Sequence, residues 1–229
     1  MNHMLRFFIS LFTVFFINIS HGNVDLKNDT IEKFGIRAGI DLNKIIRSAS
    51  NSNYTGLSIN GDIRIKKSLY IFSEIGNEDK KVNSDYLNST VKGTYIKGGV
   101  NFKLNNDIKT ENLFYSGLIL GFSNFNQSID NYTIYNTNST YWGESYIDES
   151  ISLSSLNAVW FEIVFGLKTE IFNNLFLGFE LQLKNVLKQK NSQGITNFYI
   201  PGFNRTYDSS DFGAGFSYTI SYLIPVIKK

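Results

Sequence analysis

Several residue types are scarce in this sequence, and their scarcity narrows what the protein can do. The 229 residues include no cysteine and two prolines, and both histidines, His3 and His21, lie within the first 22 residues. Without cysteine, disulfides and thiolate chemistry are excluded. Histidine is the usual general base near neutral pH and the commonest metal ligand. If the first 22 residues are removed, the remaining chain has neither histidine nor cysteine, which excludes Ser-His-Asp catalysis, Cys-His catalysis and zinc sites. We therefore expect no catalytic residues, no metal and no cofactor.

Strong net charge and long apolar runs are also missing. The formal net charge is +2 and no basic run occurs, so we expect no nucleic-acid partner. No window after residue 22 holds 18 consecutive apolar residues, so no transmembrane helix is predicted there. Aromatic residues, by contrast, are plentiful, with 20 Phe and 13 Tyr.

The N-terminus has the pattern of a secretory signal peptide. Arg6 precedes an apolar run from Phe7 to Ile17, and small residues follow at Ser20 and Gly22. This run is too short to span a bilayer, which needs about 20 residues. We therefore predict a signal peptide over 1–22 that is cleaved after Gly22. Residues 23–34 are predicted to be a polar periplasmic lead-in, and 35–229 a single barrel domain.

The rest of the chain repeats a period-two alternation. In "WFEIVFGLKTE" at 160–170, Phe161 and Phe165 lie on an apolar face, while Glu162 and Lys168 lie on the opposite face. Such alternation predicts strands with two unlike faces, each near the 9–11 residues of a tilted membrane strand. Eight such segments occur, at about 35–47, 54–66, 69–77, 91–104, 113–124, 156–171, 175–187 and 212–226.

A soluble barrel would show the same alternation with its apolar side inward. Two features favour the membrane arrangement. The polar faces carry many glycines, such as Gly117, Gly121 and Gly166, which suit a crowded lumen. The connections also alternate between short and long. Tight turns are predicted at 66–68 and 172–174, where Asn173 and Asn174 tolerate positive φ, and a short connection follows the fourth segment.

Long connections are predicted at about 78–90, 125–155 and 188–211. Short periplasmic turns and long extracellular loops are typical of outer-membrane barrels. We therefore predict an all-β fold, an eight-stranded antiparallel up-and-down transmembrane β-barrel in contact with outer-membrane lipid. Both termini would be periplasmic, and the last strand would pair with the first.

The inward faces carry comparable numbers of acids and bases. Because eight strands enclose a lumen barely wide enough for side chains, we expect a packed ion-pair network there rather than a pore or a catalytic carboxylate pair. Its predicted members are Arg37, Asp41, Asp62, Arg64, Glu74, Lys97, Glu162, Lys168, Glu180 and Lys184.

Aromatic residues among Asn, Ser and Thr mark the two longest loops. This composition resembles binding surfaces, but the same residues could form a cap packed over the barrel mouth, or belong to strands that continue beyond the membrane. Arg205 is the best single candidate for an interface ion pair. The predicted loop-binding residues are Tyr135, Tyr141, Trp142, Tyr199, Phe203, Arg205 and Tyr207.

Six strings carry a family resemblance: "RAGIDL" (37–42), "YTIYNTN" (132–138), "YWGE" (141–144), "FNNLFLG" (172–178), "YIPGFNRTYD" (199–208) and "GFSYTISYLIP" (215–225). The sequence resembles an uncharacterised family, a domain of unknown function, of outer-membrane β-barrel proteins from Bacteroidota. The resemblance implies a fold and a location without an activity. It departs from the proteobacterial pattern at the C-terminus, where "IPVIKK" replaces a terminal aromatic residue.

Three classes of function remain after these exclusions. The preferred one is a non-enzymatic barrel, structural or binding, whose aromatic loops engage another envelope protein. The alternative is a small transport or ligand-binding barrel that uses the charged lumen. An outer-membrane hydrolase or acyltransferase is disfavoured because the mature chain would lack histidine.

Overall fold

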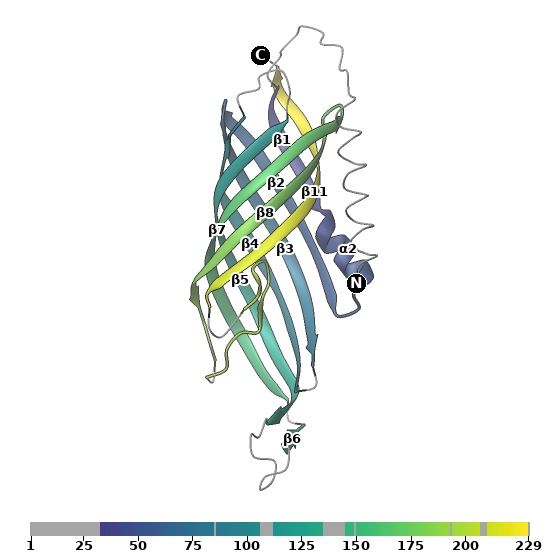
Figure 1. Cartoon of the computed structure of the whole chain (residues 1–229), viewed down its shortest axis with the longest axis vertical. Helices are drawn as coiled ribbons and strands as arrows, with labels where there is room; N and C mark the ends of the chain where they lie inside the picture. The colour runs from purple at the N-terminus through teal and green to yellow at the C-terminus, as the bar shows by residue number, and fades with distance from the viewer. Residues whose placement is uncertain are drawn as a thin grey trace, which may run out of the picture. The chain divides into compact units, whose positions relative to one another are not determined.

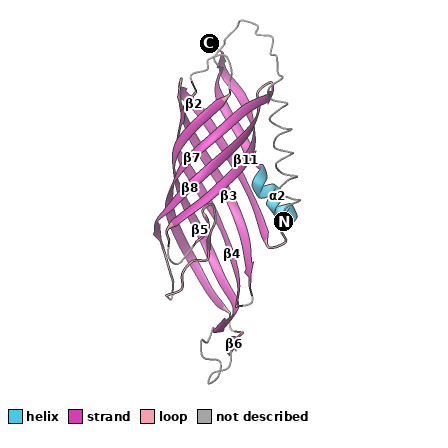
Figure 2. Cartoon of the chain, in the orientation of Figure 1, coloured by secondary structure: helices cyan, strands magenta, loops and turns pink. Residues whose placement is uncertain are grey.

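The strands form a closed antiparallel ring. The computed structural model describes residues 33–84, 86–105, 112–134, 145–148, 150–192, 194–206 and 210–228, so the predicted signal peptide lies outside the described residues. Eight strands pair in sequence order, and the last pairs with the first to close the barrel (Figures 1 and 2). They are β1 (Lys33–Asp41), β2 (Tyr54–Lys66), β3 (Leu69–Asn83), β4 (Leu87–Lys103), β5 (Leu113–Ile134), β7 (Ile151–Phe172), β8 (Leu175–Gln189) and β11 (Phe212–Lys228).

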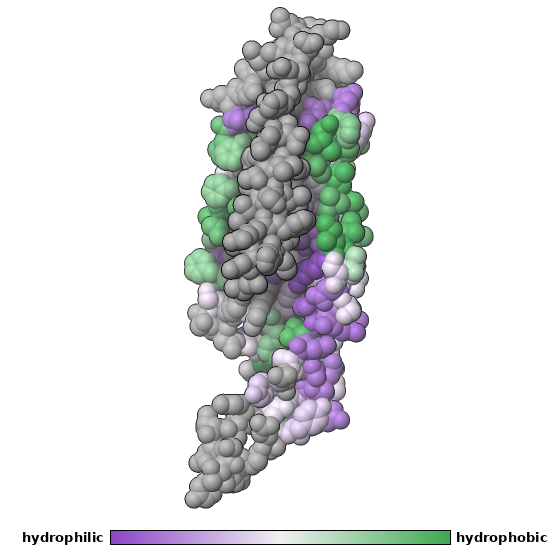
Figure 3. All heavy atoms as spheres, turned by 45° about the vertical axis from the view of Figure 1, so that its right-hand side comes forward, coloured by the Kyte–Doolittle hydropathy of each residue, from purple (hydrophilic) through white to green (hydrophobic). Residues whose placement is uncertain are grey.

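The faces of these strands are inverted relative to a soluble protein, which confirms the predicted transmembrane barrel. Outward-facing apolar side chains are exposed on the strands, for example Ile75 at 60% and Leu120 at 60%, while Glu162 and Lys97 are buried inside. Figure 3 shows the apolar residues in a band on the outer wall, with hydrophilic residues gathered toward one end. In β3 the band ends at Ile75, because the next outward residue is Asn77.

The two ends of the barrel differ, as predicted. At one end, which we call the turn end, the strands are joined through residues 67–68, 104–112 and 173–174. Asn174 has the expected positive φ, 64°. At the other, the loop end, β4, β5 and β7 continue as paired strands beyond the last β7–β8 pair, Ala158 with Gln189 (Figure 1). Short elements there are β6 (Ser145–Ile147), which pairs with β5, and the hairpin of β9 (Tyr199–Ile200) and β10 (Asn204–Arg205).

Three of the predicted boundaries are wrong. The long connection predicted at 125–155 is shorter, because β5 continues to Ile134 and β7 begins at Ile151. The segment 78–90 is not a long loop, because β3 and β4 continue to Asn83 and from Leu87. The first predicted strand also ends early, since residues 42–47 belong to helix α2 (Leu42–Ser50). Among the described residues, no helix is long and apolar enough to cross a membrane.

Helix α2 forms because Asp41 acts as its N-cap. The Asp41 carboxylate accepts a hydrogen bond from the Asn43 backbone N–H at 2.9 Å, which satisfies a free donor of the first turn. Residues three and four apart share a helix face. Lys44 and Arg47 accordingly line the barrel mouth, whereas Ile45 and Ile46 are exposed. The helix turns its polar face inward, as the strands do.

Glycines make room for large aromatic side chains inside the barrel. A Cβ on Gly166 would lie 2.2 Å from Cζ of Tyr115, and one on Gly121 would lie 2.2 Å from the Trp160 ring. Tyr115 is buried and its hydroxyl donates to Glu180 at 2.8 Å, so the ring cannot move aside without breaking this bond. These positions therefore require glycine because of packing.

We expect Gly166→Val to prevent stable closure of the barrel, because overpacking costs about 1–3 kcal/mol or more. Gly98→Val is the matched control, since Gly98 faces outward and a Cβ there meets nothing within 4 Å. The measurement is the fraction that migrates as folded protein on unheated gels after refolding into detergent. Equal folded fractions for the two variants would contradict the packing argument.

Candidate binding vestibule at the loop end

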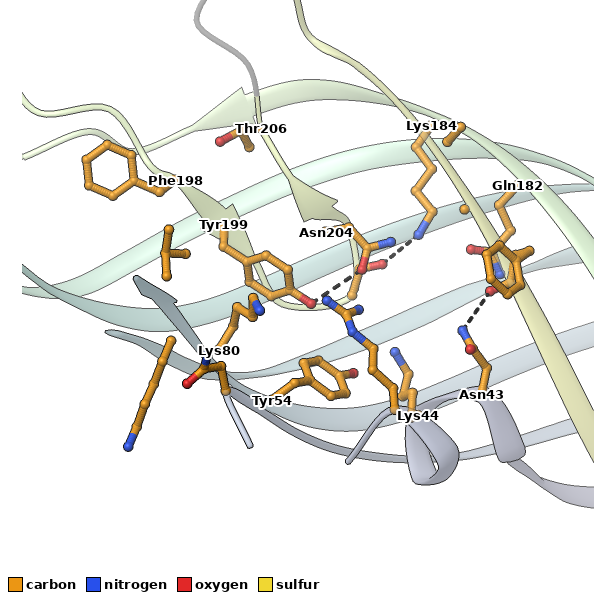
Figure 4. Close-up of a pocket in the computed structure, with 18 of the residues that line it drawn as sticks. Asn43, Lys44, Tyr54, Lys80, Gln182, Lys184, Phe198, Tyr199, Asn204 and Thr206 are labelled. Carbon is orange, nitrogen blue, oxygen red and sulfur yellow. Dashed lines mark hydrogen bonds between the residues drawn. The ribbon is translucent and has the colours of Figure 1, made fainter. Parts of the chain in front are cut away.

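A cavity of about 920 Å³ opens into the loop end of the barrel. We call it the vestibule. Its wall combines α2, the loop-end parts of β2, β3, β8 and β11, and residues 197–206, which fold back over the barrel mouth and are here named the strap. In Figure 4, Tyr54 and Lys44 lie across the cavity from Tyr199 and Asn204 of the strap. Its size suits a small-molecule ligand.

The floor of the vestibule is a buried ion-pair cluster. Glu162 is fully buried, and its Oε1 lies 3.0 Å from Nζ of Lys97 and 3.5 Å from Nζ of Lys184. Lys97 also lies 3.7 Å from Glu74, and Trp160 donates its ring N–H to Glu162 at 2.7 Å. Two carboxylates thus balance two ammonium groups, so the floor is a filled, neutral layer.

A second cluster fills the lumen toward the turn end. Asp62 accepts from Nε of Arg37 at 2.7 Å and is also paired with Lys168. The Arg37 guanidinium lies 5.0 Å from the ring centroid of Tyr70 and 5.2 Å from that of Phe176. The positive charge is therefore both paired and held between aromatic rings.

The structure places nine of the ten predicted lumen residues in the barrel interior. Two of them have other immediate partners, because Asp41 caps α2 and Glu180 accepts from Tyr115. Arg64 differs: it is half-buried toward the turn end, where its guanidinium donates to the Lys67 carbonyl at 3.1 Å. The nine buried residues are Arg37, Asp41, Asp62, Glu74, Lys97, Glu162, Lys168, Glu180 and Lys184.

One carboxylate, Glu78, fastens the strap to the barrel. Glu78 is paired with Lys44 of α2, accepts from the Tyr199 hydroxyl at 2.5 Å and accepts from the Gly202 backbone N–H at 3.2 Å. It lies three residues beyond Ile75, outside the apolar band. Burial disfavours its ionisation, but Lys44 and the two donors outweigh burial and lower the pKa of Glu78 to about 2. The carboxylate is therefore ionised at neutral pH.

Packing and a second polar contact hold the strap as well. The amide of Gln127, on β5, donates to the Thr196 carbonyl at 3.2 Å and accepts from the Phe198 backbone N–H at 2.9 Å. Phe203 packs edge-on against Trp160, with ring centroids 6.0 Å apart. Gly202 has a φ of +83°, and a Cβ there would lie 2.6 Å from the Tyr95 ring. The strap conformation therefore depends on glycine at 202.

The structure places two predicted loop-binding residues inside the barrel. Tyr199 and Phe203 are 3% and 1% exposed, so they lie in the cap over the barrel mouth rather than on an exposed binding surface. The physical reason is that the strap folds inward, where apolar rings meet Trp160 and Tyr95. The backbone of Arg205 pairs with Tyr199 in the small hairpin. The remaining predicted residues, Tyr135, Tyr141, Trp142 and Tyr207, lie outside the described residues.

Several vestibule residues were missed by the sequence analysis. Glu78 and Lys80 lay in a predicted loop, although the alternation that marks β3 continues through them. Lys44 and Arg47 lay in a predicted strand, and the N-cap signal at Asp41 could have revealed the helix. Gln127 carries no local signal, because its role depends on the strap, about 70 residues further along the chain.

The vestibule is rich in amides, hydroxyls and cations and poor in catalytic groups. Across the described residues, no cluster of three or more His, Cys, Asp or Glu side chains could hold a metal ion. The lining is suited to noncovalent binding through hydrogen bonds and charge. The fold and this site define a class: a small transmembrane β-barrel with a filled lumen and a hollow loop end.

The chain belongs to a family described as a domain of unknown function (DUF6048), whose sequence profile matches residues 4–229. No curated protein matches it. Among solved structures it is similar to Ail, the attachment invasion locus protein of Yersinia pestis, with 10% identity and a TM-score of 0.40. That match covers 83% of this chain and 94% of Ail. A likeness of this degree says nothing about activity.

We expect Glu162→Gln to lower the free energy of unfolding by about 3–5 kcal/mol, because it leaves Lys97 and Lys184 buried without their shared charge partner. Asp79→Asn is the control, since Asp79 pairs with the exposed Lys92 at 2.8 Å and a surface pair contributes little. Urea-induced unfolding of the folded protein in detergent micelles measures both. Matching unfolding midpoints for the two variants would contradict the role of the cluster.

Proposed function

We propose that this protein is a non-enzymatic outer-membrane barrel that binds a small polar ligand in the vestibule, with the loop end facing out of the cell. The single observation that carries the proposal is a hollow of about 920 Å³ above a filled, ion-paired lumen. Small-molecule sites are concave and contain a few convergent polar groups. The filled floor favours binding over passage through the barrel.

The strap supports this role. It supplies Tyr199, Asn204 and Thr206 to the cavity wall and is fixed from below by Glu78. A wall held by hydrogen bonds and packing presents its polar groups in a set arrangement, which reduces the entropy lost on binding. An outer-membrane location is supported by the predicted export signal and the outward apolar band. The short turns at the other end support the orientation, with the loop end facing out of the cell.

We expect Asn53→Trp to block the vestibule, because Asn53 lines it. Asn77→Trp is the matched control, since Asn77 lies on neighbouring β3 and faces outward just beyond the apolar band, where tryptophan is tolerated. The measurement is mass spectrometry of small molecules released from protein purified from its native outer membrane. Wild type and Asn77→Trp should carry the same compound, and Asn53→Trp should lack it.

The proposal fails if no compound accompanies the wild-type protein, or if Asn53→Trp carries the same compound in the same amount. Heat-modifiable migration on gels shows that each variant is folded, so a loss of ligand is not a loss of the barrel.

Engagement of another envelope protein is a second candidate, favoured by the projection of β4, β5 and β7 beyond β8 at the loop end (Figure 1). Tyr146 is 62% exposed beside β5, and Tyr86 is 51% exposed at the neighbouring β3–β4 connection. Exposed tyrosines are enriched at protein interfaces. This surface is separate from the buried strap, so the two candidates can be tested independently.

For this candidate we expect a Tyr86→Ala, Tyr146→Ala double variant to lose any stoichiometric protein that accompanies the wild type in gentle detergent. Lys188→Ala is the control, because Lys188 is exposed near the loop end of β8, on the side of β7 that is away from β5. Quantitative mass spectrometry of the purified complexes is the measurement. A partner that stays bound to the double variant would contradict the role of this surface.

A further inference from the structure

Two basic side chains on the vestibule wall, Arg47 of α2 and Lys80 of β3, have no acidic partner within the described part of the chain. This distinguishes them from the more deeply buried lysines of the same wall. Each of those reaches a carboxylate: Lys44 pairs with Glu78, Lys97 with Glu74 and Glu162, and Lys184 with Glu162. Within the vestibule wall, the described cations without an acidic partner are therefore at its more open part.

The two cations are brought together by Tyr54, whose ring contacts Arg47 and whose register partner in the β2–β3 pair is Lys80. Arg47 stacks over the buried ring of Tyr54, with its Cζ 3.9 Å from the ring centroid. Lys80 lies beyond the apolar band, and partial burial together with the Arg47 charge lowers its pKa. Like charges brought together in a partly enclosed space repel, and a bound anion relieves that repulsion.

The rest of the cavity is too large and too polar for a simple ion. An inorganic phosphate would leave most of the 920 Å³ unfilled. The remaining wall offers donors and acceptors suited to a body with many hydroxyl groups. These groups belong to Asn53, Asn83, Gln182, Asn197, Tyr199 and Asn204.

We propose that the vestibule binds a phosphorylated carbohydrate, with the phosphate between Arg47 and Lys80 and the sugar hydroxyls against the amide-rich wall; this rests on the proposed ligand-binding function. A phosphate monoester carries a charge of about −1.5 to −2 at neutral pH, which matches two cations. A single carboxylate would leave one cation uncompensated. The planar guanidinium fork of Arg47 also suits phosphate oxygens.

The phosphate can come from two sources, a soluble sugar phosphate or the headgroup of a phosphorylated glycolipid in the outer leaflet. The test therefore has two arms. Calorimetry on folded protein in nonionic micelles uses glucose 6-phosphate, glucose and inorganic phosphate. Binding to nanodiscs containing phosphorylated or dephosphorylated lipid A covers the second source.

For a soluble source, we expect glucose 6-phosphate to bind more tightly than inorganic phosphate and at least tenfold more tightly than glucose. For a lipid source, phosphorylated lipid A binds and the dephosphorylated form does not. In the arm that binds, Arg47→Gln and Lys80→Gln should each weaken affinity roughly tenfold, because each removes one charge-assisted contact. Lys188→Gln is the matched control and should leave affinity unchanged.

Three results overturn the inference. These are binding of glucose as tight as that of glucose 6-phosphate, full affinity in the Arg47→Gln and Lys80→Gln variants, and no binding of any phosphorylated probe in either arm. Ligand binding in the vestibule is tested separately, by whether Asn53→Trp loses the compound that accompanies the native protein. A neutral compound lost from Asn53→Trp would therefore sustain the proposed function and overturn only the phosphate.

Discussion

The structure depends on one constraint, which is that backbone polar groups facing hydrocarbon must be paired within the protein. An open sheet would leave a row of unpaired N–H and C=O groups at each edge, so β1 must pair with β11. A ring of eight strands encloses a lumen just wide enough for side chains. Charges that enter this lumen lose their hydration, and each needs a partner there. The cluster around Glu162 and the one around Asp62 follow from this requirement.

The same constraint weakens above the apolar band, where water again reaches the chain. The wall there need not be a complete sheet, and β1 ends at Asp41 while β2 and β3 continue upward. Helix α2 occupies the rim beside the shortened strand, with exposed Ile45 and Ile46 on its outer side. The strap crosses the mouth from the other side. A hollow remains between helix and strap because neither fills the space above the ion-paired floor.

Glu78 links these parts more than any other residue. It contacts Lys44 of α2 as well as Tyr199 and Gly202 of the strap, so three separate segments meet at one buried carboxylate. Its charge is satisfied within the wall, as are those of the lysines below it. Arg47 and Lys80 line the same cavity but have no acidic partner among the described residues. The paired lysines hold the vestibule wall together, whereas Arg47 and Lys80 are available to a ligand.

The local pattern of the sequence determined the eight strands, their inward and outward faces, the tight turn at Asn174 and the filling of the lumen by charge. These properties follow from a period of two along each strand, which neighbouring residues are enough to reveal. Tertiary structure alone decided that Tyr199 and Phe203 turn inward, that Gln127 holds the strap, and that Glu78 joins three segments. Each of these depends on contacts between residues far apart in the chain. The energies of such contacts cannot be read from the pattern of neighbouring residues.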